Sequence, residues 1–139
     1  MTVQAFVDSN VLIYAASTRP GEKAKKAKAV ELIGALEFGL SAQVLAEFYV
    51  TVTRKGDKPL PPHIALEWIE RLELQPCVPV DSDIVKRGAG VSVRYRISYW
   101  DGAIIAAAEA LSAAVLYSED LSHGQSYGTV RVENPFIEI

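Results

Sequence analysis

Residues 3–15 read VQAFVDSNVLIYA, two apolar runs separated by an acid, a hydroxyl and an amide. The short apolar run 5–7 predicts a buried strand, and residues 11–16 predict the opening of a helix. Asp8 therefore lies where a strand ends and a helix begins. In open α/β sheets, ligands bind at this carboxyl edge. A plain N-cap role for Asp8 or Ser9 is the alternative, and the local sequence does not exclude it.

The length and composition indicate one globular domain covering residues 1–139. Half of the residues are apolar and 22% are charged, which excludes a disordered chain. The single cysteine, Cys77, excludes an internal disulfide framework. The two histidines, His63 and His123, lack the i, i+4 spacing of a helical zinc pair, so a histidine-rich metal site is not expected.

No secretory leader is visible before Asp8, and the longest apolar stretch, residues 103–108, is too short to cross a bilayer. We therefore expect a cytoplasmic protein without a membrane partner. The net charge of -3 provides no overall positive field for nucleic acid. Basic residues nevertheless cluster locally in the ranges 23–28 and 54–58. A solvated helix face would produce the same lysine pattern.

Strands and helices alternate along the rest of the chain. This alternation predicts an α/β fold with a mostly parallel central sheet of about five short strands and helices on both faces. In the helix expected over residues 22–36, apolar spacing predicts that Val30 and Ile33 face the core. Gly88 and Gly90 should weaken the helix expected over 83–95. The other predicted elements are helices over 42–54, 63–72 and from 98, an edge strand over 77–80, strands over 113–117 and 130–132, and a loop over 121–129.

Four acids then need one explanation: Asp8, Glu47, Asp101 and Asp120. Asp8 and Asp120 each follow a strand, so a parallel sheet brings them to the same edge. Asp101 begins the helix that leads into the Asp120 strand, and a βαβ crossover starts such a helix at that same edge. Two of these acids also have simpler local explanations. Ser98 and Asp101 have the spacing of a capping box, and the position of Glu47 on its helix is equally that of a solvent-exposed residue.

Clustered carboxylates raise one another's pKa unless a cation neutralises them. Ligand sets made only of oxygen favour Mg²⁺ or Mn²⁺ over zinc. Such a metal at an open crevice suits phosphoryl chemistry, because it neutralises a phosphate and orients the in-line attack of water.

Four segments carry a resemblance to a known family: FVDSNVLIY (6–14), SAQVLAEF (41–48), SYWDGA (98–103) and LYSEDL (116–121). In order and spacing the chain resembles PIN-domain proteins, and among them the VapC-type toxins of toxin–antitoxin pairs. The resemblance implies a Mg²⁺- or Mn²⁺-dependent endoribonuclease, a VapB-like antitoxin partner and a homodimer. Ser118 stands where the family often has Thr, which keeps the hydroxyl.

The resemblance also implies roles for individual residues. Asp8, Asp101 and Asp120 would be metal ligands, and Glu47 would hold a metal water or act on the nucleophile. Asn10 and Ser118 would orient the carboxylates. Glu119 adjoins Asp120, and Asp120 is the one expected to face the metal. The basic residues expected to track the RNA backbone are Lys23, Lys25, Lys26, Arg54 and Lys55.

Two other functions are compatible with the sequence. Asp8 could be the nucleophile of a phosphatase or phosphotransferase, although haloacid-dehalogenase-like enzymes have a second Asp where this chain has Asn10. The chain could also be an RNA-binding module that keeps the fold without catalysis. For hydrolysis by water, the expected products carry a 5′-phosphate and a 3′-hydroxyl.

Overall fold

The computed structural model describes residues 2–56 and 58–139. Within them, six strands form one sheet in the order β3-β2-β1-β4-β6-β5, and only the β5–β6 pair is antiparallel. The predicted mostly parallel α/β fold is therefore confirmed. The strands are β1 (Ala5–Val7), β2 (Phe38–Ser41), β3 (Cys77–Val78), β4 (Val115–Tyr117), β5 (Ser126–Tyr127) and β6 (Val130–Glu133).

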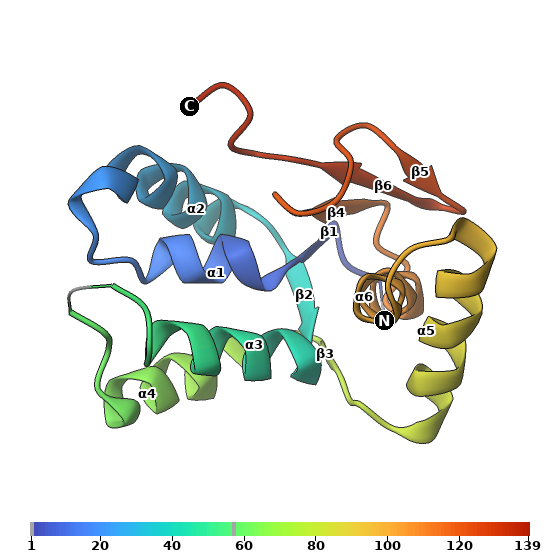
Figure 1. Cartoon of the computed structure of the whole chain (residues 1–139), viewed down its shortest axis with the longest axis horizontal. Coiled ribbons are helices and arrows are strands. Elements are labelled where there is room, and N and C mark those ends of the chain that lie inside the picture. The colour runs from blue at the N-terminus through green and yellow to red at the C-terminus, as the bar shows by residue number, and fades with distance from the viewer. Residues whose placement is uncertain (1, 57) are drawn as a thin grey trace.

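Helices cover both faces of this sheet. Helices α1 to α4 lie on one face, whereas α6 packs on the other with α5 outside it (Figure 1). Among the described residues, no helix has the length and apolar character needed to span a membrane. The helices are α1 (Ser9–Ala15), α2 (Lys23–Ala35), α3 (Ala42–Val52), α4 (Pro62–Leu72), α5 (Ser82–Tyr95) and α6 (Tyr99–Ala110), with a 3₁₀ turn, η1 (Pro20–Glu22), before α2.

The core is built around β1, whose residues are all buried because strands pair with it on both edges. Phe6 is fully buried and pairs in register with Gly39 of β2 and Leu116 of β4. Leu12 of α1 and Phe48 of α3 are also fully buried within the same core cluster. Burial of such side chains contributes about 1.5–3 kcal/mol each, so the carboxyl end of β1 is a rigid platform.

A close contact between α5 and α6 explains Gly88, a glycine that the sequence predicted would weaken its helix. A Cβ at Gly102 of α6 would lie 2.5 Å from the carbonyl oxygen of Gly88 in α5, and a Cβ at Gly88 would lie 2.9 Å from the Cα of Ala103. Gly88 thus permits a backbone approach that any side chain would block. Gly90 faces open space and has no such role.

Two sequence predictions were wrong in detail. The segment 121–129 was expected to be a loop, but it contains β5, a two-residue strand too short to leave an apolar pattern. The predicted inward face of α2 is wrong at Val30, which is 47% exposed while its neighbour Ala29 is fully buried, but Ile33 packs against the core as predicted. Lys25 and Lys26 turn partly inward instead because each bonds to another part of the chain. Polar contacts, which apolar spacing does not register, set the orientation of this helix.

Candidate active site

The acidic site forms where β1 and β4 end side by side. These strands are parallel with Val7 opposite Tyr117, so Asp8 and Ser118 leave the sheet at the same level. The neighbouring β2 ends at Ser41, whose hydroxyl accepts a hydrogen bond from Val44 N and caps α3. The sheet order therefore gathers three chain segments that are far apart in sequence.

Asp8 is both the N-cap of α1 and the centre of a buried cluster. Its Oδ1 accepts a hydrogen bond of 2.7 Å from Ser9 N. Its Oδ2 accepts one of 2.8 Å from Ser118 Oγ and a longer one of 3.5 Å from Asn10 Nδ2. The residue is only 5% exposed. The sequence left open whether Asp8 caps the helix or belongs to an acidic site. Its carboxylate does both, because Oδ1 bonds to the helix backbone and Oδ2 to the side chains of the cluster.

Asn10 connects the two strand ends. Its Nδ2 lies 3.3 Å from both Ser118 Oγ and Asp120 Oδ2, and its Oδ1 accepts a 3.1 Å hydrogen bond from Glu119 N. Ser118 is fully buried, and its Oγ also accepts from Asp120 N at 3.1 Å. The two residues expected to orient the carboxylates therefore contact both Asp8 and Asp120.

Burial raises the pKa of Asp8 to about 6. Hydrogen bonds from Ser118 and Ser9 lower the pKa of this carboxyl, whereas the negative charges of Glu47 and Asp120 raise it further. Three of the four predicted acids are thus close enough to act on one another. Within the described residues, no ion pair joins any of these three to a lysine or arginine.

Asp101, the fourth acid, lies at the first turn of α6, close to the helix that carries Glu47. Gln43 of α3 bridges the two helices, since its Nε2 lies 3.5 Å from Glu47 Oε2 and 3.2 Å from Trp100 O. Helix α6 therefore begins beside α3 at the carboxyl edge, as the crossover argument required. Ser98 Oγ accepts a hydrogen bond from Asp101 N, as the predicted cap does. The charge of Asp101 acts on Tyr127, whose pKa is raised by burial first and by Asp101 second.

Glu119 and Asp120 are neighbours in sequence but face different surroundings. Glu119 accepts hydrogen bonds of 2.6 Å from both Tyr14 Oη and Lys25 Nζ. Although burial alone would raise the pKa of Glu119, the bonds from Lys25 and Tyr14 hold it below its usual value. Asp120 instead contacts Asn10 on the side of Asp8.

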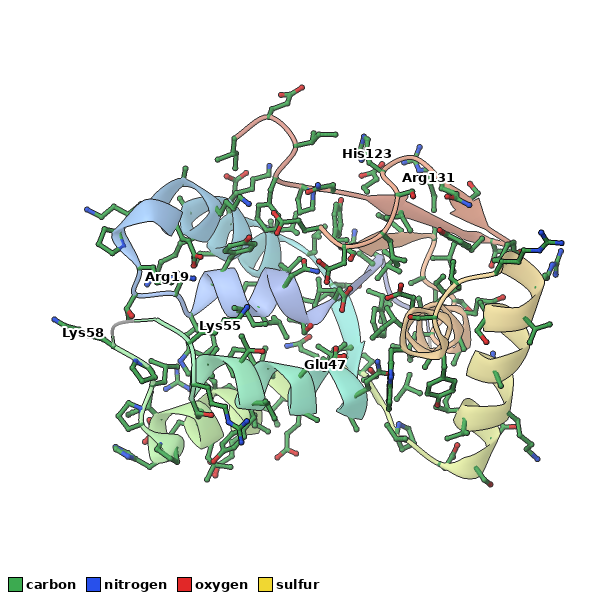
Figure 2. The ribbon with its side chains drawn as sticks, viewed as in Figure 1. Arg19, Glu47, Lys55, Lys58, His123 and Arg131 are labelled. Carbon is green, nitrogen blue, oxygen red and sulfur yellow. The ribbon has the colours of Figure 1, made fainter. Side chains whose placement is uncertain are left out.

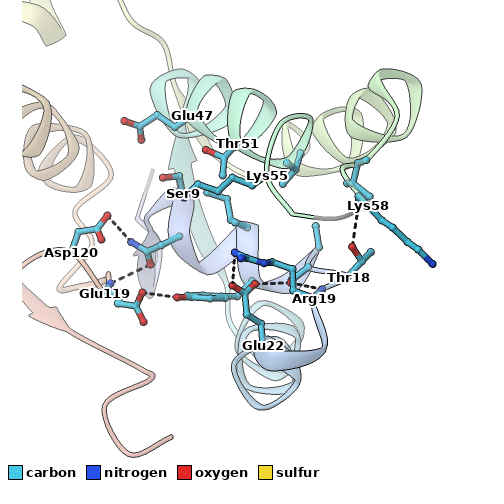
Figure 3. A pocket seen from close by; sticks show the side chains of 17 residues that line it. Ser9, Thr18, Arg19, Glu22, Glu47, Thr51, Lys55, Lys58, Glu119 and Asp120 are labelled. Carbon is cyan, nitrogen blue, oxygen red and sulfur yellow. Dashed lines mark hydrogen bonds and ion pairs between the residues drawn. The ribbon is translucent and has the colours of Figure 1, made fainter.

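A groove of about 380 Å³ between α1 and α3 joins the acids to a basic end (Figure 3). Glu47, Asp120 and Asn10 line it near the sheet. Arg19, Lys55 and Lys58 gather at the outer ends of the helices (Figure 2). The groove therefore has an acidic end beside the sheet and a more basic end away from it.

The predicted basic residues divide into two groups. Lys25 is paired with Glu119, and Lys26 Nζ donates to Ser17 O at 2.7 Å. Lys23, Arg54 and Lys55 are exposed, and of these Lys55 lines the groove. Sequence reasoning missed Arg19 and Thr51, which also line it. Thr51 follows Glu47 at i+4, a helical spacing that could have identified it.

The donor set fits a hard divalent cation. Within residues 2–56 and 58–139, no three side chains of His, Cys, Asp or Glu stand close enough to bind one ion together. Magnesium, however, is commonly held by one or two carboxylates while water and substrate phosphates complete its coordination. Asp8 and Asp120, joined through Asn10, supply such a pair of carboxylates. Their oxygen chemistry disfavours zinc.

Comparison with known proteins bears on the family and the fold. The family model described as PIN domain matches residues 5–125. No curated protein matches the chain. Among solved structures, a toxin–antitoxin complex from Klebsiella pneumoniae is similar at 19% identity, with a TM-score of 0.70 and coverage of 95% of this chain and 98% of that one.

Two further structures are similar over most of their length. VapC20 from Mycobacterium tuberculosis, a toxin that cleaves the sarcin-ricin loop, is 18% identical, with a TM-score of 0.67 and coverage of 84% of this chain and 89% of that one. FitAB bound to a DNA fragment is 22% identical, with a TM-score of 0.67 and coverage of 94% of both chains. At these identities the likeness establishes a common fold.

Proposed function

The chain belongs to the PIN-domain family, and on that premise we propose that it is a Mg²⁺- or Mn²⁺-dependent endoribonuclease and the toxin of a VapBC-like toxin–antitoxin pair. One observation is the main support for metal-dependent catalysis. Asp8 is buried, and its pKa is raised partly by Glu47 and Asp120, yet no lysine or arginine of the described chain pairs with any of the three. Such a cluster suits an external cation.

Asp8 and Asp120 would hold the metal directly, and Asp101, at the first turn of α6, would contact it through a bound water. Bound Mg²⁺ or Mn²⁺ would supply charge neutralisation for the phosphate and a lowered pKa for the attacking water. Asn10 and Ser118 fix the two carboxylates through hydrogen bonds of 2.8–3.5 Å. Glu47, across the groove mouth, would accept a proton or a hydrogen bond from the attacking water. Cleavage of the P–O3′ bond leaves a 5′-phosphate and a 3′-hydroxyl.

The partner proposals rest on the similar structures. The complex from Klebsiella pneumoniae is a toxin–antitoxin complex, and VapBC2 from Rickettsia felis was solved bound to promoter DNA. For this chain we expect a VapB-like antitoxin encoded by a small neighbouring reading frame, and a homodimer. Co-expression with that antitoxin should relieve growth arrest, and light scattering should give twice the chain mass.

The direct test uses the purified chain, labelled RNA, and either Mn²⁺ or EDTA. We expect cleavage with Mn²⁺, none with EDTA, and a loss of at least about 100-fold in Asp8→Asn and Asp120→Asn. Asp81→Asn is the matched control, because Asp81 caps α5 through Ile84 N and is exposed. Cleavage that survives chelation would overturn the metal mechanism. Binding of RNA by the wild type without any cleavage would instead support a non-catalytic module.

A further inference from the structure

The acidic and basic ends of the groove are connected by one face of α3 and its continuation. Glu47, Thr51 and Lys55 are spaced by four residues and all line the groove. Lys55 N donates to Thr51 O at 2.9 Å, so the helical path continues past the end of α3. At 1.5 Å per residue, Lys55 lies about 12 Å along the axis from Glu47. At the ~3.4 Å rise per nucleotide of a stacked strand, this distance spans about three to four nucleotides, so the two ends lie beside different phosphates.

Arg19 is held at this end by contacts that leave most of its donors free. Its Nη1 lies 3.3 Å from Glu22 Oε2, and Glu22 Oε1 accepts a 2.6 Å hydrogen bond from Ser17 Oγ. A guanidinium has five N–H donors, and the Glu22 contact uses one. Gly56, at φ +87°, passes beneath the side chain, and a Cβ there would lie 3.4 Å from Arg19 Cγ.

Lys55 and Lys58 differ in direction although both come from the segment after α3. Lys55 extends into the groove, whereas the Lys58 side chain points away from it (Figure 3). No hydrogen bond or ion pair engages the Lys55 ammonium within residues 2–56 and 58–139. Lys58 contributes its backbone carbonyl, which accepts a 3.1 Å hydrogen bond from Thr18 Oγ1 and ties the two loops together.

We propose that Arg19 and Lys55 form a phosphate-binding subsite for a nucleotide a few steps along the RNA strand whose scissile phosphate lies at Asp8. This inference rests on the proposed function for the position of the scissile phosphate. Its chemistry follows from charge: planar, multidentate Arg and flexible Lys are the side chains that bind phosphate oxygens. A second positive contact also offsets the repulsion between a polyanion and the acids at the other end.

The test measures binding separately from cleavage. Wild type, Lys55→Met and Arg19→Met are titrated in EDTA against a fluorescein-labelled oligouridylate of about 12 nucleotides, at several salt concentrations. Each substitution should weaken binding about tenfold. Each should also reduce the slope of log K against log salt by about 0.7, the value for one phosphate contact on a single strand. Lys86→Met removes the same charge from an exposed side chain of α5 that does not line the groove, and should leave the slope unchanged.

A Mn²⁺ cleavage assay on the same variants separates the two proposals. Lys55→Met should raise KM for the RNA while kcat stays within about twofold of wild type, because the contact is remote from the reacting phosphate. Equal slopes for Lys55→Met and Lys86→Met, or no salt-dependent binding by the wild type, would overturn the subsite. Salt-dependent binding that needs Lys55, together with an absence of cleavage, would overturn the nuclease and leave the phosphate contact standing.

Discussion

Replacing Asp8 with Asn should change the stability of the metal-free protein in a pH-dependent way. Burial raises the pKa of this carboxyl from 3.8 to about 6. Between these values the unfolded chain has lost the proton that the native chain still binds, so the free energy of unfolding falls as pH rises. Because one pKa unit corresponds to about 1.4 kcal/mol, the ionised Asp8 costs the native state about 3 kcal/mol well above pH 6.

The substitution removes this cost but disturbs the hydrogen bonds. An amide at position 8 can still accept from Ser9 N, whereas its NH₂ would face the Ser118 hydroxyl and the Asn10 amide, which both donate to Asp8 at present. We take this loss as about 1 kcal/mol, independent of pH. Asp8→Asn should therefore be about 0.5 kcal/mol less stable than the wild type near pH 4, where part of the cost is already present, and about 2 kcal/mol more stable near pH 8.

Urea unfolding followed by circular dichroism in EDTA, at intervals from about pH 4 to pH 8, measures this difference. Asp81→Asn is the control, since it alters an exposed capping carboxylate and should show no such trend. A difference between Asp8→Asn and wild type that stays constant over the whole pH range would refute the argument. Mn²⁺ at about 100 times its Kd should add about 2.7 kcal/mol to the wild type and much less to Asp8→Asn.

Three further predictions concern the supporting structure. Ser118→Ala should lose about 2 kcal/mol of stability in urea unfolding, because it removes the 2.8 Å hydrogen bond to the buried Asp8 carboxylate and leaves Asp8 Oδ2 with only the 3.5 Å bond from Asn10; a loss under about 0.5 kcal/mol would contradict this. Gly102→Ala should cost about 2 kcal/mol or more, since the new Cβ meets Gly88 O, whereas Gly90→Ala at an open helical position should gain about 0.5–1 kcal/mol. Equal thermal shifts for the two glycine variants would refute the packing argument. Lys25→Met should cost about 1 kcal/mol, discounted because the pair with Glu119 is partly exposed, and a double-mutant cycle with Glu119→Gln should return most of that energy as coupling.

The sequence predicted the part of the site that follows from strand order. Asp8, Asn10, Ser118 and Asp120 all flank strand ends, so a parallel sheet alone is enough to bring them together. Contacts between distant side chains left no local signal. Lys25 and Glu119 are 94 residues apart in sequence, and nothing near either residue indicates the other. Their pairing also accounts for the partial burial of Lys25, which the apolar spacing of α2 did not predict.

The groove's basic end was predicted only in part, and the reason is again geometric. Lys55 stood within a visible basic cluster, but so did Lys58, and composition cannot tell which side chain points into a groove. Arg19 lies in a breaker-rich loop and gains its place from Glu22 and from the positive φ of Gly56. Loop conformation of this kind is set by tertiary contacts, which periodicity in the sequence does not report.

The contrast between Glu119 and Asp120 bears most directly on the proposed metal. These adjacent acids share one turn after β4, yet only Glu119 has a cation within the described chain, namely Lys25 at 2.6 Å. Both acids line the groove, but the fold neutralises only Glu119 and leaves Asp120, with Asp8, to an outside charge. Supplying a second internal lysine would have stabilised the free protein, but it would also have occupied the position that a divalent ion needs. The cost of about 3 kcal/mol at Asp8 is, on this argument, the part of the folding energy that metal binding recovers.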